Sequence, residues 1–300
     1  MYKCLLFVFL YISLSPLYVA QWTNINTNAA GNSLLNVYFA DTYTGWAVGR
    51  VGTILKTESA AKSWTRQNSG VNSDLLTIHF YDVNTGYAAG AGGTLLKTND
   101  GGDNWMPITS AGAADDIMYV HSFAADNVIL IDKQGILRKS TNGGSNWTSV
   151  NTAAGTADAA FFATPDTGWV MSSTCNLSIT VDGGENWTSI FSSQLSGRVF
   201  RMHFSDNLHG WMVFKGSYYS YFGDNVQRSL LLKTVDGGLN WSVSSYTGNT
   251  FDHYTDVFFL DNSTGWFVQF YDVTAHLAPD KDNRNRSYSP DLFSQIKKTT

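Results

Sequence analysis

The chain has 300 residues, a net charge of −5 at neutral pH, two cysteines and five prolines. Its 27 glycines, 10 tryptophans, 15 tyrosines and 18 phenylalanines favour strands and turns, while glutamate, a usual residue of surface helices, is almost absent. A mildly acidic chain without a basic run is not expected to bind nucleic acid, and we predict an all-β protein large enough to bury its own core.

The first 20 residues have the pattern of a secretory signal peptide. Lys3 precedes an apolar run from Leu5 to Leu14, and Ala20 is a small residue at the expected cleavage site. The run is shorter than the ~20 apolar residues of a membrane span, so we expect no stable span after cleavage. The mature chain, 21–300, would keep one cysteine, Cys175, and form no internal disulfide. We expect it in the periplasm, at the cell surface or outside the cell.

A tryptophan that follows a Gly-Gly turn recurs roughly every 40 to 45 residues along the mature chain. The copies read TNDGGDNW, STNGGSNW, TVDGGENW and TVDGGLNW, and a degenerate copy, TESAAKSW, ends at Trp64. Most copies follow a second mark, a glycine and an aromatic residue as in NTGYAAG, and a strand that ends in Lys-Thr, as in GTLLKT. Each unit therefore predicts four short antiparallel strands.

Four strands per unit at this period are typical of a β-propeller blade. We expect blades at about 34–67, 75–108, 117–150, 157–190, 199–244 and 254–300, of which the first five are complete. The stretch QWTNINTNAAG, from Gln21 to Gly31, resembles NWTSVNTAAG at the end of the third unit. We therefore expect residues 21–26 to form the fourth strand of a blade.

Two interpretations of that strand remain open. It can close a six-bladed ring by pairing beside residues 295–299, which would remove an open sheet edge. Alternatively, the chain is a truncated part of a seven-bladed ring. The second is favoured, because SQIKKTT ends where the next D-G-G turn should follow.

The D-G-G turns have a structural explanation. The aspartate of each turn can accept hydrogen bonds from backbone N–H groups of its own turn, and the glycines can adopt positive φ angles. The tryptophan would then pack on a neighbouring strand. The motif resembles the Asp-box, or BNR-type, hairpin of sialidases and sortilin-type receptors, in which the box lies on the rim, away from the axis. The box residues, expected to be structural, are Asp100, Gly101, Gly102, Trp105, Gly143, Gly144, Trp147, Asp182, Gly183, Gly184, Trp187, Asp236, Gly237, Gly238 and Trp241.

The full combination F-x-D-x-x-T-G-W-A-V-G, G-T-I-L-K-T and D-G-G-x-x-W resembles the photosystem II assembly and stability factor family of β-propellers. The resemblance extends over the mature chain and implies a propeller that binds protein partners. In photosynthetic members an arginine-rich patch is associated with partner binding. This chain has only eight arginines, and that site cannot be transferred to it residue by residue.

An enzymatic role is a weaker interpretation. Sialidase chemistry needs a glutamate near its tyrosine nucleophile, and the chain has only Glu58 and Glu185, both in box turns. A glycosidase that uses two aspartates remains an alternative. Candidate carboxylates near the blade starts are Asp74, Asp116, Asp158 and Asp256. The six histidines, among them His79 and His203, show no metal-ligand spacing, so we expect neither a metal nor another cofactor.

Two insertions break the repeat. The first, Phe214 to Ser229, carries the candidate binding residues Tyr218, Tyr219, Tyr221, Phe222 and Arg228. Clustered aromatic residues can bind a protein or stack on sugars, but the insertion can equally extend a hairpin and pack its rings on the blade. The second, between Trp266 and Lys298, is polar and is interpreted as a surface loop. Taken together, the sequence predicts a secreted, non-enzymatic interaction scaffold with a protein or cell-surface glycan partner, or alternatively a carbohydrate-binding or hydrolytic propeller.

Overall fold

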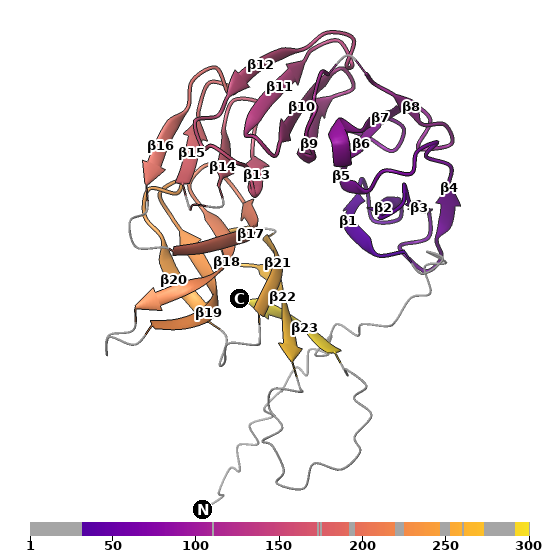
Figure 1. The fold of residues 1–300 in the computed structure, drawn as a ribbon. Coiled ribbons are helices and arrows are strands. Elements are labelled where there is room, and N and C mark those ends of the chain that lie inside the picture. The colour runs from indigo at the N-terminus through magenta and orange to yellow at the C-terminus, as the bar shows by residue number, and fades with distance from the viewer. Residues whose placement is uncertain are drawn as a thin grey trace, which may run out of the picture.

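The computed structural model describes residues 32–109, 111–172, 174, 176–191, 196–219, 225–246, 253–259, 261–272 and 292–299. These residues form sheets that follow one another in chain order around a common axis, with the first strand of each sheet innermost (Figure 1). The prediction of an all-β propeller with four-stranded antiparallel blades is confirmed. The predicted signal peptide and the strand 21–26 lie outside the described residues.

The first three blades contain twelve strands. Blade 1 is β1 (Leu34–Phe39), β2 (Gly45–Gly49), β3 (Ile54–Thr57) and β4 (Thr65–Gln67). Blade 2 is β5 (Leu75–Phe80), β6 (Gly86–Gly90), β7 (Leu95–Thr98) and β8 (Met106–Pro107), with a 3-10 turn η1 (Ala91–Gly93) between β6 and β7. Blade 3 is β9 (Ile117–Ala124), β10 (Asn127–Asp132), β11 (Ile136–Ser140) and β12 (Thr148–Asn151).

The remaining strands form two further blades and one smaller sheet. Blade 4 is β13 (Ala159–Phe162), β14 (Gly168–Met171), β15 (Asn176–Thr180) and β16 (Thr188–Phe191). Blade 5 is β17 (Ser196–Phe204), β18 (Gly210–Tyr219), β19 (Asn225–Thr234) and β20 (Ser242–Tyr246). The last sheet has three strands, β21 (His253–Phe259), β22 (Gly265–Asp272) and β23 (Leu292–Thr299).

The expected count of six blades is therefore wrong for the described residues, which form five four-stranded blades. β21–β23 form a three-stranded sheet, because no described strand pairs with the free edge of β23. No helix in the described part of the chain is long and apolar enough to cross a membrane.

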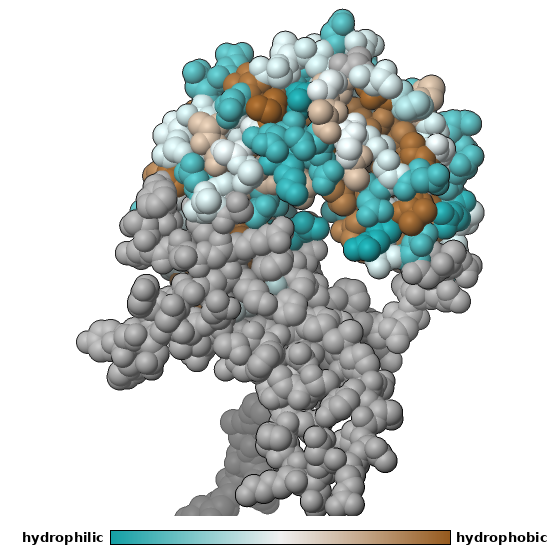
Figure 2. Space-filling model, viewed as in Figure 1, coloured by the Kyte–Doolittle hydropathy of each residue, from teal (hydrophilic) through white to brown (hydrophobic). Residues whose placement is uncertain are grey.

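The core lies at the junctions between blades. Each of the five buried clusters combines residues of two consecutive sheets, as where Trp46 of blade 1 packs with Phe80 of blade 2. The two rings are stacked with centroids 3.5 Å apart, and Trp169 with Phe204 and Trp211 with Phe259 repeat the contact. On the surface, hydrophilic and hydrophobic residues are interspersed, and hydrophobic residues gather over blades 1 and 2 (Figure 2).

Packing at the same junctions explains why a glycine precedes the aromatic residue at the start of the second strand of a blade. Gly86 lies opposite Phe80 in the sheet, and a Cβ at Gly86 would lie 2.5 Å from the Phe80 ring. Gly168 and Gly210 have the same relation to Phe162 and Phe204. The T-G-W pattern of the sequence thus leaves room for a phenylalanine of the same blade, and Phe80 and Phe204 use it to stack on a tryptophan of the preceding blade.

Candidate functional site

The intact box turns have one hydrogen-bond pattern. In blade 2, Thr98 Oγ1 donates to Asp100 and accepts the Gly102 N–H at 2.8 Å, while Asp100 accepts the backbone N–H of Asn104 at 2.9 Å and its side-chain amide at 2.8 Å. Asp182 and Asp236 make the same contacts in blades 4 and 5. In blade 3, Asn142 replaces the aspartate and accepts the Asn146 N–H.

The box glycines occupy the left-handed backbone region. Their φ angles lie between 66° and 95° in the list Gly101, Gly102, Gly143, Gly144, Gly183, Gly184, Gly237 and Gly238. The first glycine of each box donates its N–H to the turn between the first two strands of the same blade, for example Gly101 to Asn84 O at 2.8 Å. The two turns of a blade are therefore held together on one face of the propeller, called here the turn face.

The box tryptophans pack within their own blades. Trp147, Trp187 and Trp241 donate Nε1–H to the second box glycine carbonyl at 3.0–3.1 Å. Trp105 and Trp241 lie edge-on to Phe80 and Phe204. In these contacts the box residues stabilise the hairpin.

Strand residues of one blade also contact the box of the next blade. Trp46 Nε1 donates to Gly101 O at 3.0 Å and Trp169 Nε1 to Gly237 O at 2.8 Å. Lys97 donates to Gly143 O at 3.4 Å and pairs with Asp126 at 3.6 Å. Lys97, and Lys233 through its bond to Asn262 O, therefore link consecutive sheets, a role that cannot be predicted from the sequence because nothing local marks the partner.

Two of the candidate catalytic aspartates accept hydrogen bonds from turns of the preceding blade. Asp74 Oδ1 accepts the Val51 N–H and Asp116 Oδ1 accepts the Gly92 N–H, each at 3.0 Å. Asp158 lies half-buried at the start of blade 4. The Asp256 side chain lies outside the described part of the structure. In the described residues no group of three or more histidine, cysteine, aspartate or glutamate side chains could hold a metal ion.

Half-buried aromatic side chains from successive inner strands surround the axis and are called here the axial ring. Each pairs with the second residue of the neighbouring strand's G-aromatic mark, or with Ile129 at the same position in blade 3. The set is Tyr38, His79, His121, Phe161, His203 and the more exposed Phe258. Consecutive centroids are 4.5 Å apart for Tyr38–His79, 3.8 Å for His79–His121, 5.0 Å for Phe161–His203 and 4.8 Å for His203–Phe258.

Hydrogen bonds explain two of the ring histidines. His79 Nδ1 accepts the Ser122 N–H at 3.1 Å, and His203 Nδ1 accepts the Phe259 N–H at 3.3 Å. Each histidine thus satisfies a backbone donor on the inner edge of the next sheet. At the junction of blades 3 and 4, Tyr119 does the same through its hydroxyl and the Phe162 N–H.

The ring is uncharged at neutral pH. Burial lowers the pKa of His121 and of His203 to about 4, and burial together with the nearby His121 lowers the pKa of His79 well below its usual value. The triplets I-H-F and M-H-F place His79 and His203 at equivalent positions of two blades. His121 was missed because blade 3 lacks the G-aromatic mark that aligns the others.

A groove opens on the turn face where the ring is interrupted. No ring contact joins His121 to Phe161 among the described residues, and His121 packs on Phe123 with centroids 4.4 Å apart. The groove has a volume of about 620 Å³ and is lined by His121, Phe161, Phe162, Ala163, Thr164, Phe204, Ser205, Asp206, Asn207 and Leu208. This size falls within the ~300–1,000 Å³ of small-ligand sites.

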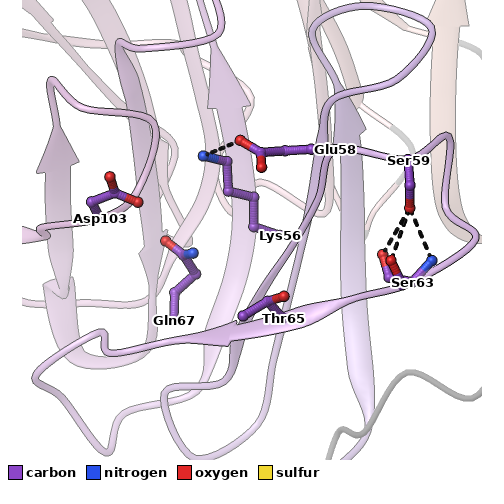
Figure 3. A pocket seen from close by; sticks show the side chains of 7 residues that line it. All are labelled: Lys56, Glu58, Ser59, Ser63, Thr65, Gln67 and Asp103. Atoms are coloured by element: carbon purple, nitrogen blue, oxygen red, sulfur yellow. Dashed lines mark hydrogen bonds and ion pairs between the residues drawn. The ribbon is translucent and has the colours of Figure 1, made fainter.

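A second cavity, of about 420 Å³, lies at the degenerate box and is polar. Figure 3 shows Glu58 paired with Lys56 and Ser59 bonded to Ser63, with Gln67 and Asp103 on the other side. The Lys56 Nζ and Glu58 Oε1 atoms are 2.9 Å apart. Glu58 is therefore engaged in an ion pair next to the box turn of blade 1.

The aromatic insertion extends a hairpin. β18 and β19 remain paired as far as Tyr219 opposite Asn225, with Tyr218 opposite Val226 and Gly216 opposite Arg228. This backbone agrees with the interpretation of a longer hairpin. Tyr221 and Phe222 lie outside the described residues, and so do the side chains of Tyr218, Tyr219 and Arg228.

Comparison with known proteins supports the resemblance drawn from the motifs. Residues 57–155 match the family model described as "Photosynthesis system II assembly factor YCF48". No curated protein matches the chain. The chain thus resembles this family in sequence over residues 57–155.

Solved structures resemble the chain in fold. A structure of YCF48 bound to a D1 peptide has 18% identity and a TM-score of 0.58, covering 82% of this chain and 91% of that one. YCF48 from Cyanidioschyzon merolae has 17% identity and a TM-score of 0.57, covering 79% and 93%. The GH74 enzyme of Niastella koreensis has 17% identity and a TM-score of 0.61, covering 82% of this chain but only 42% of that one. At these identities the likeness shows the propeller fold alone.

Proposed function

We propose that this chain is an exported interaction propeller of the assembly-factor type, which binds a polypeptide partner on its turn face. The observation that carries the proposal is the axial ring, whose aromatic side chains are half-buried and uncharged where a glycosidase would need an acid and a base. The match to the assembly-factor family and the peptide-bound YCF48 structure support a protein partner.

The role of the aspartates adds support. Asp74 and Asp116 accept backbone N–H groups of turns, and the box aspartates do so in their own hairpins. In the box turns such hydrogen bonds favour the ionised carboxylate, whereas a general acid needs a raised pKa. The Asn104 side chain and N–H lower the pKa of Asp100 to about 2. The Asp100 carboxylate is therefore a poor proton donor near neutral pH.

Export is part of the proposal and rests on the pattern of residues 1–20. Expression in a host with a general secretion pathway should release a mature chain that begins at Gln21. Sequencing the N-terminus of the exported protein measures this, and an uncleaved chain retained in the membrane would contradict it.

The alternative is a carbohydrate-active propeller, which the fold of the GH74 enzymes leaves open. The experiment that separates the two is affinity capture with the mature protein from its own envelope fraction, with a parallel hydrolysis assay on xyloglucan. We expect capture of polypeptide that salt and protease treatment abolish, and no release of reducing sugar. Recovery of glycan alone, with measurable hydrolysis, would refute the interaction scaffold.

A further inference from the structure

The groove at the interruption of the axial ring has apolar walls and an exposed apolar rim. Half-buried Phe161 of blade 4 and buried Phe204 of blade 5 line it next to each other, with ring centroids 6.1 Å apart. Leu208, in the first-to-second turn of blade 5, is 54% exposed at the rim. A groove lined by an exposed leucine and by aromatic residues is suited to an apolar side chain rather than to a charged one.

The rim side chains are already bonded within their own turns. Thr164 Oγ1 accepts the N–H groups of Asp166 and Thr167, and Asp206 Oδ1 accepts those of Leu208 and His209. The turns that frame the groove are therefore held in shape by internal bonds. A partner would find preformed walls, which reduces the entropy cost of binding.

The turn face that carries the groove is rich in carboxylates, because the repeat uses an aspartate in nearly every turn; Asp206 lines the groove and Asp166 lies in the neighbouring turn. Exposed or half-buried members are Asp41, Asp82, Asp100, Asp103, Asp126, Asp166, Asp182, Asp206, Asp236 and Asp261. Among the described residues, only Asp126 and Asp206 of this set lie within ion-pair distance of a basic side chain. Burial alone would raise the pKa of Asp206, but the N–H groups of His209 and Leu208 outweigh it and the pKa is lowered.

Apolar walls inside an acidic face define the complementary partner. We propose that the groove between the turns of blades 4 and 5 binds an aromatic side chain carried by a basic polypeptide segment. This inference rests on the proposed function and adds the chemistry of its partner. The aromatic ring would enter the groove against Phe161 and Leu208, and the flanking basic residues would face the aspartates of the turn face.

The test uses capped tripeptides as probes of the mature protein. Acetyl-Lys-Trp-Lys-amide should bind with a millimolar Kd and shift the NMR signals of the His121 imidazole. Acetyl-Glu-Trp-Glu-amide and acetyl-Lys-Ala-Lys-amide should each bind at least about tenfold more weakly, which corresponds to ~1.4 kcal/mol. Salt should weaken the first peptide most, because its charges are solvent-exposed.

Variants locate the site. Phe161→Ala removes a wall and Leu208→Lys adds a positive charge at an exposed rim position, so each should weaken the Lys-Trp-Lys peptide at least about fivefold. Tyr43→Ala is the matched control, because Tyr43 is an exposed aromatic residue on the same acidic face of blade 1. Leu208→Lys should still fold, because the Leu208 side chain is largely exposed, so a loss of binding in this variant cannot be attributed to unfolding.

Several outcomes would overturn the proposal: no binding of Lys-Trp-Lys up to about 10 mM, equal binding of the Glu-Trp-Glu peptide, or equal loss in Tyr43→Ala. A xyloglucan oligosaccharide that shifts His121 while the peptides do not would also overturn it. If the groove fails these tests but affinity capture still recovers polypeptide, the proposed function stands and the site lies elsewhere.

Discussion

The degenerate box of blade 1 and the intact box of blade 4 form the same hairpin from different residues. Thr57 Oγ1 accepts the Ala61 N–H at 3.1 Å, as Thr180 Oγ1 accepts the Gly184 N–H at 2.8 Å. Ser59 accepts the Ser63 N–H where Asp182 accepts that of Asn186. The hairpin is thus determined by a side-chain hydroxyl, of threonine or of Ser140 in blade 3, and by a short acceptor two residues later; a carboxylate is not required.

The intact boxes have glycines where the degenerate box has alanines, and the reason lies in contacts with the preceding blade. Ala60 and Ala61 have φ angles of 54° and 63°, so the degenerate box holds alanines in the left-handed region that costs an L-residue about 1–2 kcal/mol. A Cβ at Gly184 would lie 2.1 Å from Leu137 of blade 3, and one at Gly144 would lie 2.6 Å from Ile108 of blade 2. The second glycine therefore gives the preceding blade room to pack.

Blade 1 has no preceding blade in the described part of the chain. Phe39 and Val37 are 40% and 56% exposed, while the equivalent Phe80 and Ile78 of blade 2 are buried. The alanine at position 61 stands on this open side. The box motif therefore reflects two separate requirements: the hydrogen bonds of its own hairpin, and space for the side chains of the preceding blade.

The largest loss of stability is expected when a tryptophan that contacts the box of the next blade is removed. Trp169→Ala deletes the stack on Phe204, with centroids 3.7 Å apart, and the bond to Gly237 O in the box of blade 5. We expect the free energy of unfolding to fall by about 3–5 kcal/mol, as for other fully buried large side chains. Urea denaturation followed by tryptophan fluorescence measures the loss. Trp64→Ala, in the degenerate box, is the control and should cost less, because Trp64 is only half-buried.

The axial-ring histidines and the box carboxylates should affect stability in different pH ranges. Because the folded pKa of His121 and of His203 is about 4, below the ordinary 6.5, protons bind preferentially to the unfolded chain between these values. Stability should be complete above pH 6.5 and fall by on the order of 3 kcal/mol for each of the two histidines as the pH decreases to 4. Thermal unfolding across this range measures it. The box carboxylates add their loss only below pH 3.8, because the Asn186 N–H and side chain hold the pKa of Asp182 at about 2.

A double substitution tests that assignment. Asp182→Ser with Asn186→Ser gives blade 4 the residues of the degenerate box, and its stability should decline between pH 6.5 and 4 as steeply as that of the unmodified chain. A flatter decline in the variant would place the effect in the box rather than in the ring.

Much of this architecture could be predicted from the sequence, and the missing part has a physical explanation. The blades could be located because the glycine opposite Phe80 and the box glycines must leave space for other atoms, which restricts the residue type. The axial ring could not, because its positions accept tyrosine, histidine or phenylalanine alike: any flat ring fits beside its neighbour. The groove could not either, since it depends on where His121 turns relative to Phe123, a contact within one strand that no repeat position marks.

Gly184→Ala tests whether the neighbour is what demands glycine. The new Cβ would meet Leu137, and the residue would keep a φ of 88°. We expect a cost of roughly 1–3 kcal/mol from overpacking and backbone strain. The double variant Gly184→Ala with Leu137→Ala should show a smaller combined loss than the sum of the single losses. Strict additivity would show that Leu137 is not the source of the constraint.

The converse substitution is the smallest and the most discriminating change. Ala61→Gly relieves a φ of 63° on the open side of blade 1, where no described neighbour needs the space. Glycine removes the left-handed penalty but increases the entropy of the unfolded chain, so we expect a net gain of about 0.5–1 kcal/mol. Equilibrium urea denaturation detects this as a higher midpoint with an unchanged slope. Ala159→Gly, at a strand position of blade 4, is the control and should destabilise, because there the entropy cost acts without any relief of strain. A loss of stability in Ala61→Gly would mean that the alanine methyl packs against a part of the molecule that faces blade 1, and the degenerate box would then have a neighbour of its own.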